Sequence, residues 1–397
     1  MTANITCYAV IQGLATSLDT LCAQAYGSGH KHLVGLQFQR MTWFLLVLVV
    51  PISVLWLNAA ELLAMLLPER ESAELAGLYL RVCILSMPAY AIFEAAKRFV
   101  QAQGIFHATT YCLMVAAPLN VFLSWLFVWK LDWGFVGAPI SVVITQNLMP
   151  ILLLLYVVFV DGSQCWGGFT KRALSNWGPM IRLALPGMIM VEAEWFAFEI
   201  LTLVSGRFGT SQLAAQSILV TITSTTYQIP FPLSVAASTR VANLIGAKLV
   251  GAAKTSAKVA IIAGSIIGVA NMIIVTALRE KLPLLFTQDE EVIAIVAKVL
   301  PICAVMQVFD GMAALSHGLL RGIGRQEFGG YANLVSYYII ALPVSFGVGV
   351  GLGWELAGLW IGVTGGLCLV ATVEYLFLYK YDWSRAVLEA ERRNANS

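Results

Sequence analysis

Apolar residues fill most of the chain in long runs, and short polar segments separate these runs. A helix needs about 20 mainly apolar residues to cross the hydrocarbon core of a bilayer. Glycine and proline interrupt several runs, which membrane helices tolerate when neighbouring helices satisfy the freed backbone groups. The pattern predicts eleven membrane-spanning helices, at 5–24, 41–67, 76–96, 106–128, 135–159, 180–204, 210–238, 256–278, 293–320, 331–352 and 357–379.

The polar segments between these runs alternate in charge. Most of the 24 Lys and Arg residues lie in one set of connections, at 31–40, 97–98, 171–182, 240–258, 321–325 and 380–393. Segments of the other set are short and acidic, as at 68–74 and 287–291. Because basic connections remain on the cytoplasmic side of a membrane, the basic set and the C-terminus are predicted to be cytoplasmic.

Composition supports a polytopic membrane protein. Of the 397 residues 59% are hydrophobic and 12% are charged, whereas an ordinary soluble protein has about 25% charged residues. The net charge of +2 and the lack of a basic block argue against nucleic acid as a partner. The seven cysteines lie mainly in apolar runs and are expected to be buried thiols. The sequence contains no nucleophile, metal-ligand or cofactor motif, so neither an enzyme nor a cofactor or metal site is expected.

One predicted span contains an unusual concentration of acids. The stretch VEAEWFAFE (191–199) has three glutamates inside an apolar helix, although a charge at the bilayer centre costs about 2.5–3.5 kcal/mol. A carboxyl group held away from water favours its neutral form, so it can exchange protons near neutral pH. Helical geometry places Glu192 and Glu199 on one face and Glu194 about 140° from Glu199.

The sequence also repeats at an offset near 220. LDWGFVGAPI (131–140) matches LGWELAGLWI (352–361), DTLCAQAYG (19–27) matches STRVANLIG (238–246), and RFVQAQG (98–104) lies over GLLRGIG (318–324). A repeat of six helices points both halves in the same direction through the membrane, which is a known plan for transporters.

This repeat predicts six helices in each half, but the partner of the helix at 180–204 falls before residue 1. We therefore expect the chain to lack the first helix and the start of the second. The predicted organisation is an N-terminal bundle at 1–160, a cytoplasmic linker at 161–179, a C-terminal bundle at 180–380 and a tail at 381–397. The tail is either a short amphipathic segment or disordered.

Five segments together resemble one transporter family. They are QGLATSLDTLCAQAYGSG (12–29), EWFAFE (194–199), IPFPLSVAASTRVANLIGA (229–247), VFDGMAALSHGLLRGIGRQ (308–326) and NLVSYYIIALPVS (333–345). In this order they resemble the eukaryotic-type branch of the multidrug and toxic compound extrusion (MATE) transporters. The resemblance implies an all-α fold of two six-helix bundles facing a central cavity. It also implies a monomeric secondary antiporter that expels organic cations in exchange for protons or sodium.

The resemblance assigns roles to three acids. In this branch, glutamates matching Glu194 and Glu199 serve proton coupling and cation binding, and plant members have a functional aspartate at the position of Asp310. The chain departs from the family pattern at Glu192, where an uncharged residue is usual, and in the absent first helix, which in prokaryotic relatives has a functional acid. A structural role in hydrogen bonding between helices is the alternative for each acid.

Further polar residues are candidates for a binding pocket. Asn333, Tyr337 and Tyr338 follow Asp310 along the chain, and Gln228 precedes it. Aromatic rings beside acids suit organic cations, because a ring face attracts a desolvated cation; ordinary packing is the alternative for both tyrosines. For Asp19 in the N-terminal bundle, structural and functional roles are both open. Glu94 is expected to pair with Lys97 three residues later.

Taken together, these features predict an antiporter that exports organic cations, xenobiotics or metabolites in exchange for protons, from a plasma or vacuolar membrane. Two alternatives are a lipid or lipid-linked flippase of the same superfamily and a truncated paralogue that does not transport. A flippase would need a basic cavity for a phosphate headgroup, whereas the charges inside the predicted spans are mainly acidic.

Overall fold

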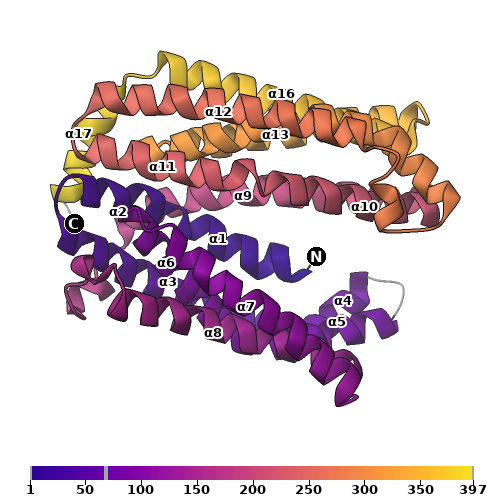
Figure 1. The fold of residues 1–397 in the computed structure, drawn as a ribbon, viewed down its shortest axis with the longest axis horizontal. Helices are drawn as coiled ribbons and strands as arrows, with labels where there is room; N and C mark the ends of the chain where they lie inside the picture. The colour runs from indigo at the N-terminus through magenta and orange to yellow at the C-terminus, as the bar shows by residue number, and fades with distance from the viewer. Residues whose placement is uncertain (1, 67–69, 396–397) are drawn as a thin grey trace. The chain divides into compact units, whose positions relative to one another are not determined.

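The computed structural model describes residues 2–66 and 70–395, and every regular element within them is a helix (Figure 1). Pro68 and Glu69 of the predicted acidic segment lie outside the described residues. Contacts divide the chain into two compact units, the first formed by Met1–Arg182 with Arg393–Ser397 and the second by Leu183–Arg392.

The first unit is a bundle in which α2, α3, α6 and α8 pack on one another. A wide π-helical turn at Asn4–Tyr8 opens it. Its helices are α1 (Ala9–Ala15), α2 (Ser17–Gly27), α3 (Lys31–Leu57), α4 (Ala59–Leu66), α5 (Arg70–Cys83), α6 (Met87–Ala102), α7 (His107–Trp125) and α8 (Gly137–Phe159).

The second unit is built around α13, which packs against α10, α11, α12 and α16; Figure 1 shows α11, α12, α13 and α16 side by side. Its helices are α9 (Gly178–Ser205), α10 (Thr210–Tyr227), α11 (Pro230–Gly246), α12 (Val250–Ala277), α13 (Glu290–Ile323), α14 (Gln326–Leu334), α15 (Leu342–Phe346), α16 (Glu355–Lys380) and α17 (Trp383–Ala395).

Nine helical segments of the described residues are long and apolar enough to span a membrane, and each overlaps one of the eleven predicted spans. The predicted bounds 41–67 are wrong, because that helix runs over Lys31–Leu57 and α4 follows it as a separate helix. The predicted span at 180–204 is helical as α9, but its three glutamates and Arg182 keep it outside that set. At 210–238 the chain forms two shorter helices, α10 and α11. Pro230 begins α11, where its missing N–H costs no hydrogen bond and its ring sets the start of a new helix.

The span at Gln326–Gly351 changes its helical geometry along its length. It begins as α14, widens into the π-helix η9 (Val335–Ala341) and continues through α15. π-Helical turns are rare and occur often at functional sites. In this chain the wide turn holds two of the candidate pocket residues, Tyr337 and Tyr338.

The segment after α8 packs on α3 of the same unit. The Gln39 amide nitrogen donates to the Gly168 carbonyl over 2.8 Å, and the Arg40 guanidinium donates to the Arg172 carbonyl over 3.4 Å. A Cβ on Gly35 would lie 2.5 Å from the Cys165 carbonyl oxygen, so this close approach requires glycine. Burial raises the pKa of the Cys165 thiol to about 11, against a smaller lowering by Lys31.

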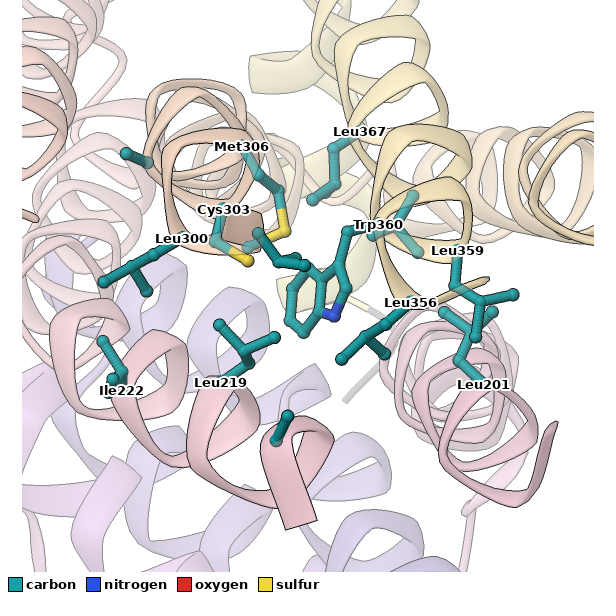
Figure 2. Packing of buried hydrophobic residues seen from close by; sticks show 14 of the residues in the cluster. Leu201, Leu219, Ile222, Leu300, Cys303, Met306, Leu356, Leu359, Trp360 and Leu367 are labelled. Carbon is teal, nitrogen blue, oxygen red and sulfur yellow. The ribbon is translucent and has the colours of Figure 1, made fainter. Parts of the chain in front are cut away.

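One of the apolar core clusters of the second unit joins α9, α10, α13 and α16 (Figure 2). Trp360 of α16 lies 2% exposed among Leu219, Met306 and Leu356, and its indole N–H donates to the Gln216 side-chain oxygen over 2.8 Å. A buried indole needs such an acceptor. This core packs α16 against α10 and α13.

Most of the predicted tail forms the helix α17. Trp383, Ala386 and Ala390 recur at helical spacing and are buried in a cluster with residues of α11, α12 and α13. Arg325 fixes the start of this segment, since its guanidinium donates to the Tyr381 hydroxyl over 3.1 Å and pairs with Glu389.

Candidate functional site

The three glutamates of α9 are half-buried and have different surroundings. Glu194 interacts electrostatically with His317 and Glu374. Glu192 interacts with Tyr338 instead, and its Oε1 atom is buried without a hydrogen-bond partner among the described residues. Glu199 follows Glu192 by seven residues and shares its face of the helix. The rotation of about 140° that separates Glu194 from Glu199 therefore divides these acids into two settings.

Asp310 is brought to Glu194 by α13. Its side chain is 7% exposed, and its carboxyl group interacts electrostatically with that of Glu194. Small residues let α13 approach its neighbours closely: a Cβ on Gly318 would lie 2.5 Å from the Ser234 carbonyl oxygen of α11. Two carboxyl groups in one buried site oppose each other's ionisation, so this pair favours holding a proton or a cation.

His317 lies seven residues after Asp310 on the same face of α13. Its Nε2 atom is 3.2 Å from Glu374 Oε1 of α16 and 3.3 Å from Asn333 Oδ1 of α14. The hydroxyl of Ser316 also donates to Glu374, and the Asn333 amide nitrogen donates to the Met190 carbonyl of α9 over 2.7 Å. Four helices thus meet at one buried polar cluster.

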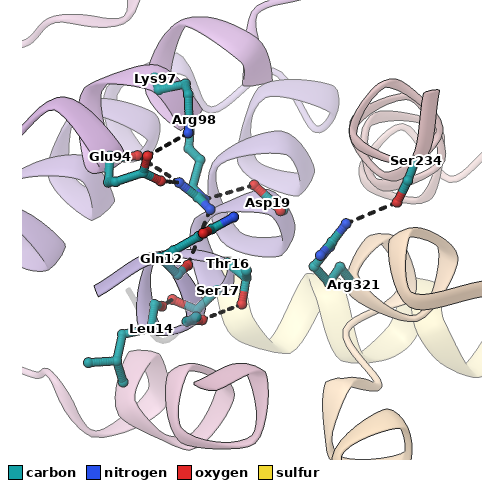
Figure 3. A network of polar contacts seen from close by, with 11 residues as sticks. Gln12, Leu14, Thr16, Ser17, Asp19, Glu94, Lys97, Arg98, Ser234 and Arg321 are labelled. Atoms are coloured by element: carbon teal, nitrogen blue, oxygen red, sulfur yellow. Dashed lines mark hydrogen bonds and ion pairs between the residues drawn. The ribbon is translucent and has the colours of Figure 1, made fainter. Parts of the chain in front are cut away.

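Arg321 and two tyrosines complete the surroundings. The Arg321 guanidinium donates to the Ser234 hydroxyl over 3.1 Å (Figure 3). Tyr337 is 1% exposed, and its hydroxyl oxygen is buried without a hydrogen-bond partner among the described residues. Both Tyr337 and Tyr227 interact electrostatically with Glu194 and Asp310. We call the group formed by Glu194, Asp310, His317, Glu374, Arg321, Tyr227, Asn333 and Tyr337 the acidic cluster.

The remaining pocket candidates lie outside this cluster. The Tyr338 hydroxyl donates to the Ala193 carbonyl over 3.1 Å, which places this ring beside α9 near Glu192. Gln228 is exposed at the break between α10 and α11. The structure therefore joins Asn333 and Tyr337 to Glu194 and Asp310, and it gives Tyr338 a structural hydrogen bond.

Asp19 belongs to a separate ion-pair network in the first unit (Figure 3). Its Oδ1 atom lies 3.3 Å from Arg98 Nε, and the same guanidinium contacts Glu94 Oε2 over 2.5 Å. Glu94 also accepts from Lys97 over 2.6 Å, which confirms the predicted pair. The network contains two acids and two bases, and Asp19, Glu94 and Arg98 are all buried. Balanced charges of this kind suit a structural role.

Sequence reasoning missed His317 and gave little weight to Glu374. The spacing could have indicated His317, because it lies two helical turns after Asp310 in the motif at 308–326. Glu374 gave no local signal, since its contacts with His317 and Ser316 join residues far apart in sequence.

The acidic cluster combines three carboxyl groups, one imidazole and one guanidinium within apolar packing. Carboxyl groups and imidazole take up and release protons near neutral pH when their surroundings are tuned. Within the described residues, no group of three or more His, Cys, Asp and Glu side chains is placed to hold a metal ion. Groups of these types can exchange protons and attract cations.

Comparison with known proteins gives this fold a family. The MatE family model matches residues 1–126 and 186–346. An uncharacterized transporter of Schizosaccharomyces pombe, C4B3.13, is 42% identical over 395 residues, which are 99% of this chain and 73% of the relative. Multidrug and toxin extrusion protein 2 of Mus musculus is 32% identical over 391 residues, which are 98% of this chain and 68% of the relative.

Solved structures agree with these matches. The crystal structure of the eukaryotic MATE transporter AtDTX14 superimposes with a TM-score of 0.94 at 29% identity, over 99% of this chain and 88% of that one. The chain spans 56% to 74% of the length of three fungal relatives with which it shares 41% to 42% identity. Its motifs, helical fold and relatives agree, and the chain belongs to the MATE family of multi-pass membrane transporters.

Proposed function

We propose that this chain is a secondary antiporter that exports organic cations in exchange for protons. The observation that carries the proposal is the electrostatic interaction between Glu194 and the buried Asp310, within the helices of the second unit. Acids within membrane helices are rare and usually mark ion or substrate pathways. Relatives that are named multidrug and toxin extrusion proteins support organic compounds as the exported class.

The mechanism follows from two occupants that exclude each other. When the Glu194–Asp310 pair holds a proton, its negative charge is lowered and a bound organic cation loses its counter-ion. When the proton leaves, the ionised carboxylate attracts a cation again. Each occupant thus changes the affinity for the other by the same factor, which is the thermodynamic condition for coupled exchange.

The remaining acids of α9 have supporting roles in this proposal. Glu199 is half-buried on the face of the helix away from Glu194 and provides a second site for a proton or a cation. Tyr337 and Tyr227 interact electrostatically with both Glu194 and Asp310. Aromatic rings at this point favour a desolvated cation over a neutral molecule.

Transport of ethidium, a fluorescent permanent cation, tests the proposal. The purified chain is reconstituted in vesicles with an imposed pH gradient, and a sodium gradient without a pH gradient serves as the second arm. We expect ethidium to move in the direction opposite to the flow of protons. This movement should stop when a protonophore removes the pH gradient. Movement driven by the sodium gradient alone would show that sodium, not the proton, is the coupling ion. No movement in either arm would refute the proposed antiport.

A further inference from the structure

The contacts of His317 determine which ring nitrogen carries a hydrogen. The Asn333 amide nitrogen donates to the Met190 carbonyl, which can only accept, so its Oδ1 atom faces the imidazole. His317 Nε2 therefore faces two acceptor oxygens, Asn333 Oδ1 at 3.3 Å and Glu374 Oε1 at 3.2 Å. Two acceptors at one nitrogen require an N–H group there.

Glu374 makes the protonated imidazole the favourable form. Its side chain is fully buried, at 0% exposure, and an ionised carboxylate without a partner is costly in such a place. The Ser316 hydroxyl donates to its Oε2 atom, and the His317 imidazole lies 3.2 Å from its Oε1 atom as an ion-pair partner. A carboxylate that accepts from an imidazole stabilises the imidazolium, as in other buried His–acid pairs.

Charged and titratable groups surround this pair on every side. The charged neighbours of the pair are Glu194 of α9 and Asp310 and Arg321 of α13. The neighbouring tyrosines are Tyr227 of α10, Tyr337 of η9 and Tyr375 of α16. Ser234 of α11 holds Arg321, and α14 contributes Asn333. Asn333 contacts His317 and donates to the Met190 carbonyl, one helical turn before Glu194, and His317 and Glu194 interact electrostatically.

We propose that His317, kept protonated by Glu374, is a positioning residue that sets the charge state of Glu194, and with it the pH at which a cation binds. This inference rests on the proposed antiport and adds a residue to it. An imidazolium beside Glu194 stabilises the carboxylate against the neutral acid. The proton that Glu194 releases goes to water, and His317 keeps its own proton throughout.

The charge of His317 also affects the organic cation. The positive imidazolium next to Glu194 repels the organic cation, so it weakens binding of that cation to the ionised site. It also keeps Glu194 ionised at lower pH, so binding extends to lower pH. A residue that only packs in the core has neither effect. The midpoint pH of cation binding and the affinity at high pH therefore report on the charge of His317 and not on its packing in the core.

Equilibrium binding of ethidium to the purified chain between about pH 5 and pH 9 measures both quantities. We expect the midpoint of His317→Gln to move upward by about one pH unit or more, with unchanged or tighter binding at high pH. His317→Lys retains a positive charge next to Glu374 and should stay closer to the wild-type midpoint. Glu374→Gln removes the group that keeps the imidazole protonated, and its midpoint should move upward by less than that of His317→Gln.

Ser316→Ala is the matched control, because it removes one hydrogen bond to Glu374 but no charge. Its midpoint should match that of the wild type. Equal midpoints for wild type, His317→Gln and Glu374→Gln would overturn the inference while leaving the antiporter intact. If His317→Gln does not fold, His317→Asn replaces it in the same comparison, and a wild-type midpoint in that variant overturns the inference. Binding by the wild type that does not change with pH would refute the proposed exchange and this inference together.

Discussion

Arg98 Nε lies 3.3 Å from Asp19 Oδ1, and this ion pair joins α6 to α2 in the interior of the first unit. Both side chains are less than a tenth exposed, at 6% and 7%. Glu94 and Lys97 balance the remaining charges of the network. A buried ion pair adds little net stability over an apolar pair, but removing one partner leaves an uncompensated charge.

Arg98→Met should therefore destabilise the chain strongly. We expect a loss of about 3–5 kcal/mol, since Asp19 loses its guanidinium partner and Glu94 keeps only Lys97. Thermal unfolding of the purified protein in detergent measures the change. Arg70→Met is the matched control, because its pair with Glu74 is exposed at 86% and 64%, and such pairs contribute little. Equal effects of the two substitutions would contradict a structural role for the network.

Neutral replacements of the membrane acids test the exchange site. Glu199→Gln and Asp310→Asn should each reduce pH-driven ethidium efflux to background, because an amide cannot exchange a proton. Glu194→Gln should do the same, since Glu194 pairs with Asp310. Glu192→Gln should cost less than about tenfold, equivalent to 1.4 kcal/mol, since this acid lies outside the family pattern. Membrane abundance is measured in parallel, and full pH-dependent efflux by a Glu199→Gln, Asp310→Asn double variant would refute the mechanism.

Phenylalanine variants of two neighbouring tyrosines, Tyr337 and Tyr338, distinguish a residue that contacts the ligand from one that stabilises the fold. The Tyr337 hydroxyl is buried without a hydrogen-bond partner among the described residues, so Tyr337→Phe should leave thermal stability unchanged or slightly raised. The Tyr338 hydroxyl donates to the Ala193 carbonyl, so Tyr338→Phe should lose about 1 kcal/mol. If the Tyr337 hydroxyl contacts the transported cation, its variant alone should reduce ethidium binding without reducing stability. Normal binding by Tyr337→Phe would remove this tyrosine from the pocket.

Much of the fold could be predicted from sequence because the signals for it are local. Runs of about 20 apolar residues specify helices wherever they occur, and the nine matching segments follow this rule. The Glu94–Lys97 pair is three residues apart on one helix and was predictable for the same reason. The break before Pro230 is also local, although the apolar run at 210–238 concealed it as one helix.

The rest of the acidic cluster depends on contacts between distant segments. His317 meets Glu374 across 57 residues and Asn333 across 16, and Met190 meets Asn333 across 143. Periodicity places Asp310 and His317 on one face of α13 but does not show which helix covers that face. The same limit applies to Asp19, whose partner Arg98 lies on another helix.

Charge along the chain predicts which connections face the cytoplasm. An impermeant thiol reagent applied from outside intact cells should label a cysteine introduced at Thr287, in the acidic connection, within minutes. A cysteine introduced at exposed Lys171, in a basic connection, should react only after the membrane is opened. Native thiols other than Cys368 are buried, so the background should be low. Labelling of the Lys171 position from outside would reverse the proposed orientation.

Cys165 reports whether the segment after α8 stays packed on α3. Burial raises the pKa of this thiol to about 11, so at neutral pH its thiolate fraction is about a hundred times lower than that of an ordinary exposed cysteine. Alkylation by a maleimide, measured on a variant whose other cysteines are replaced, should be slow and should rise about tenfold per pH unit below the pKa. Gly35→Ala places a Cβ 2.5 Å from the Cys165 carbonyl oxygen and should displace the segment, so alkylation at neutral pH should become at least tenfold faster. Gly167→Ala is the matched control, because its Cβ would meet no atom within 4 Å and the rate should not change. Slow alkylation in both variants would mean that the thiol stays buried without the close contact at Gly35.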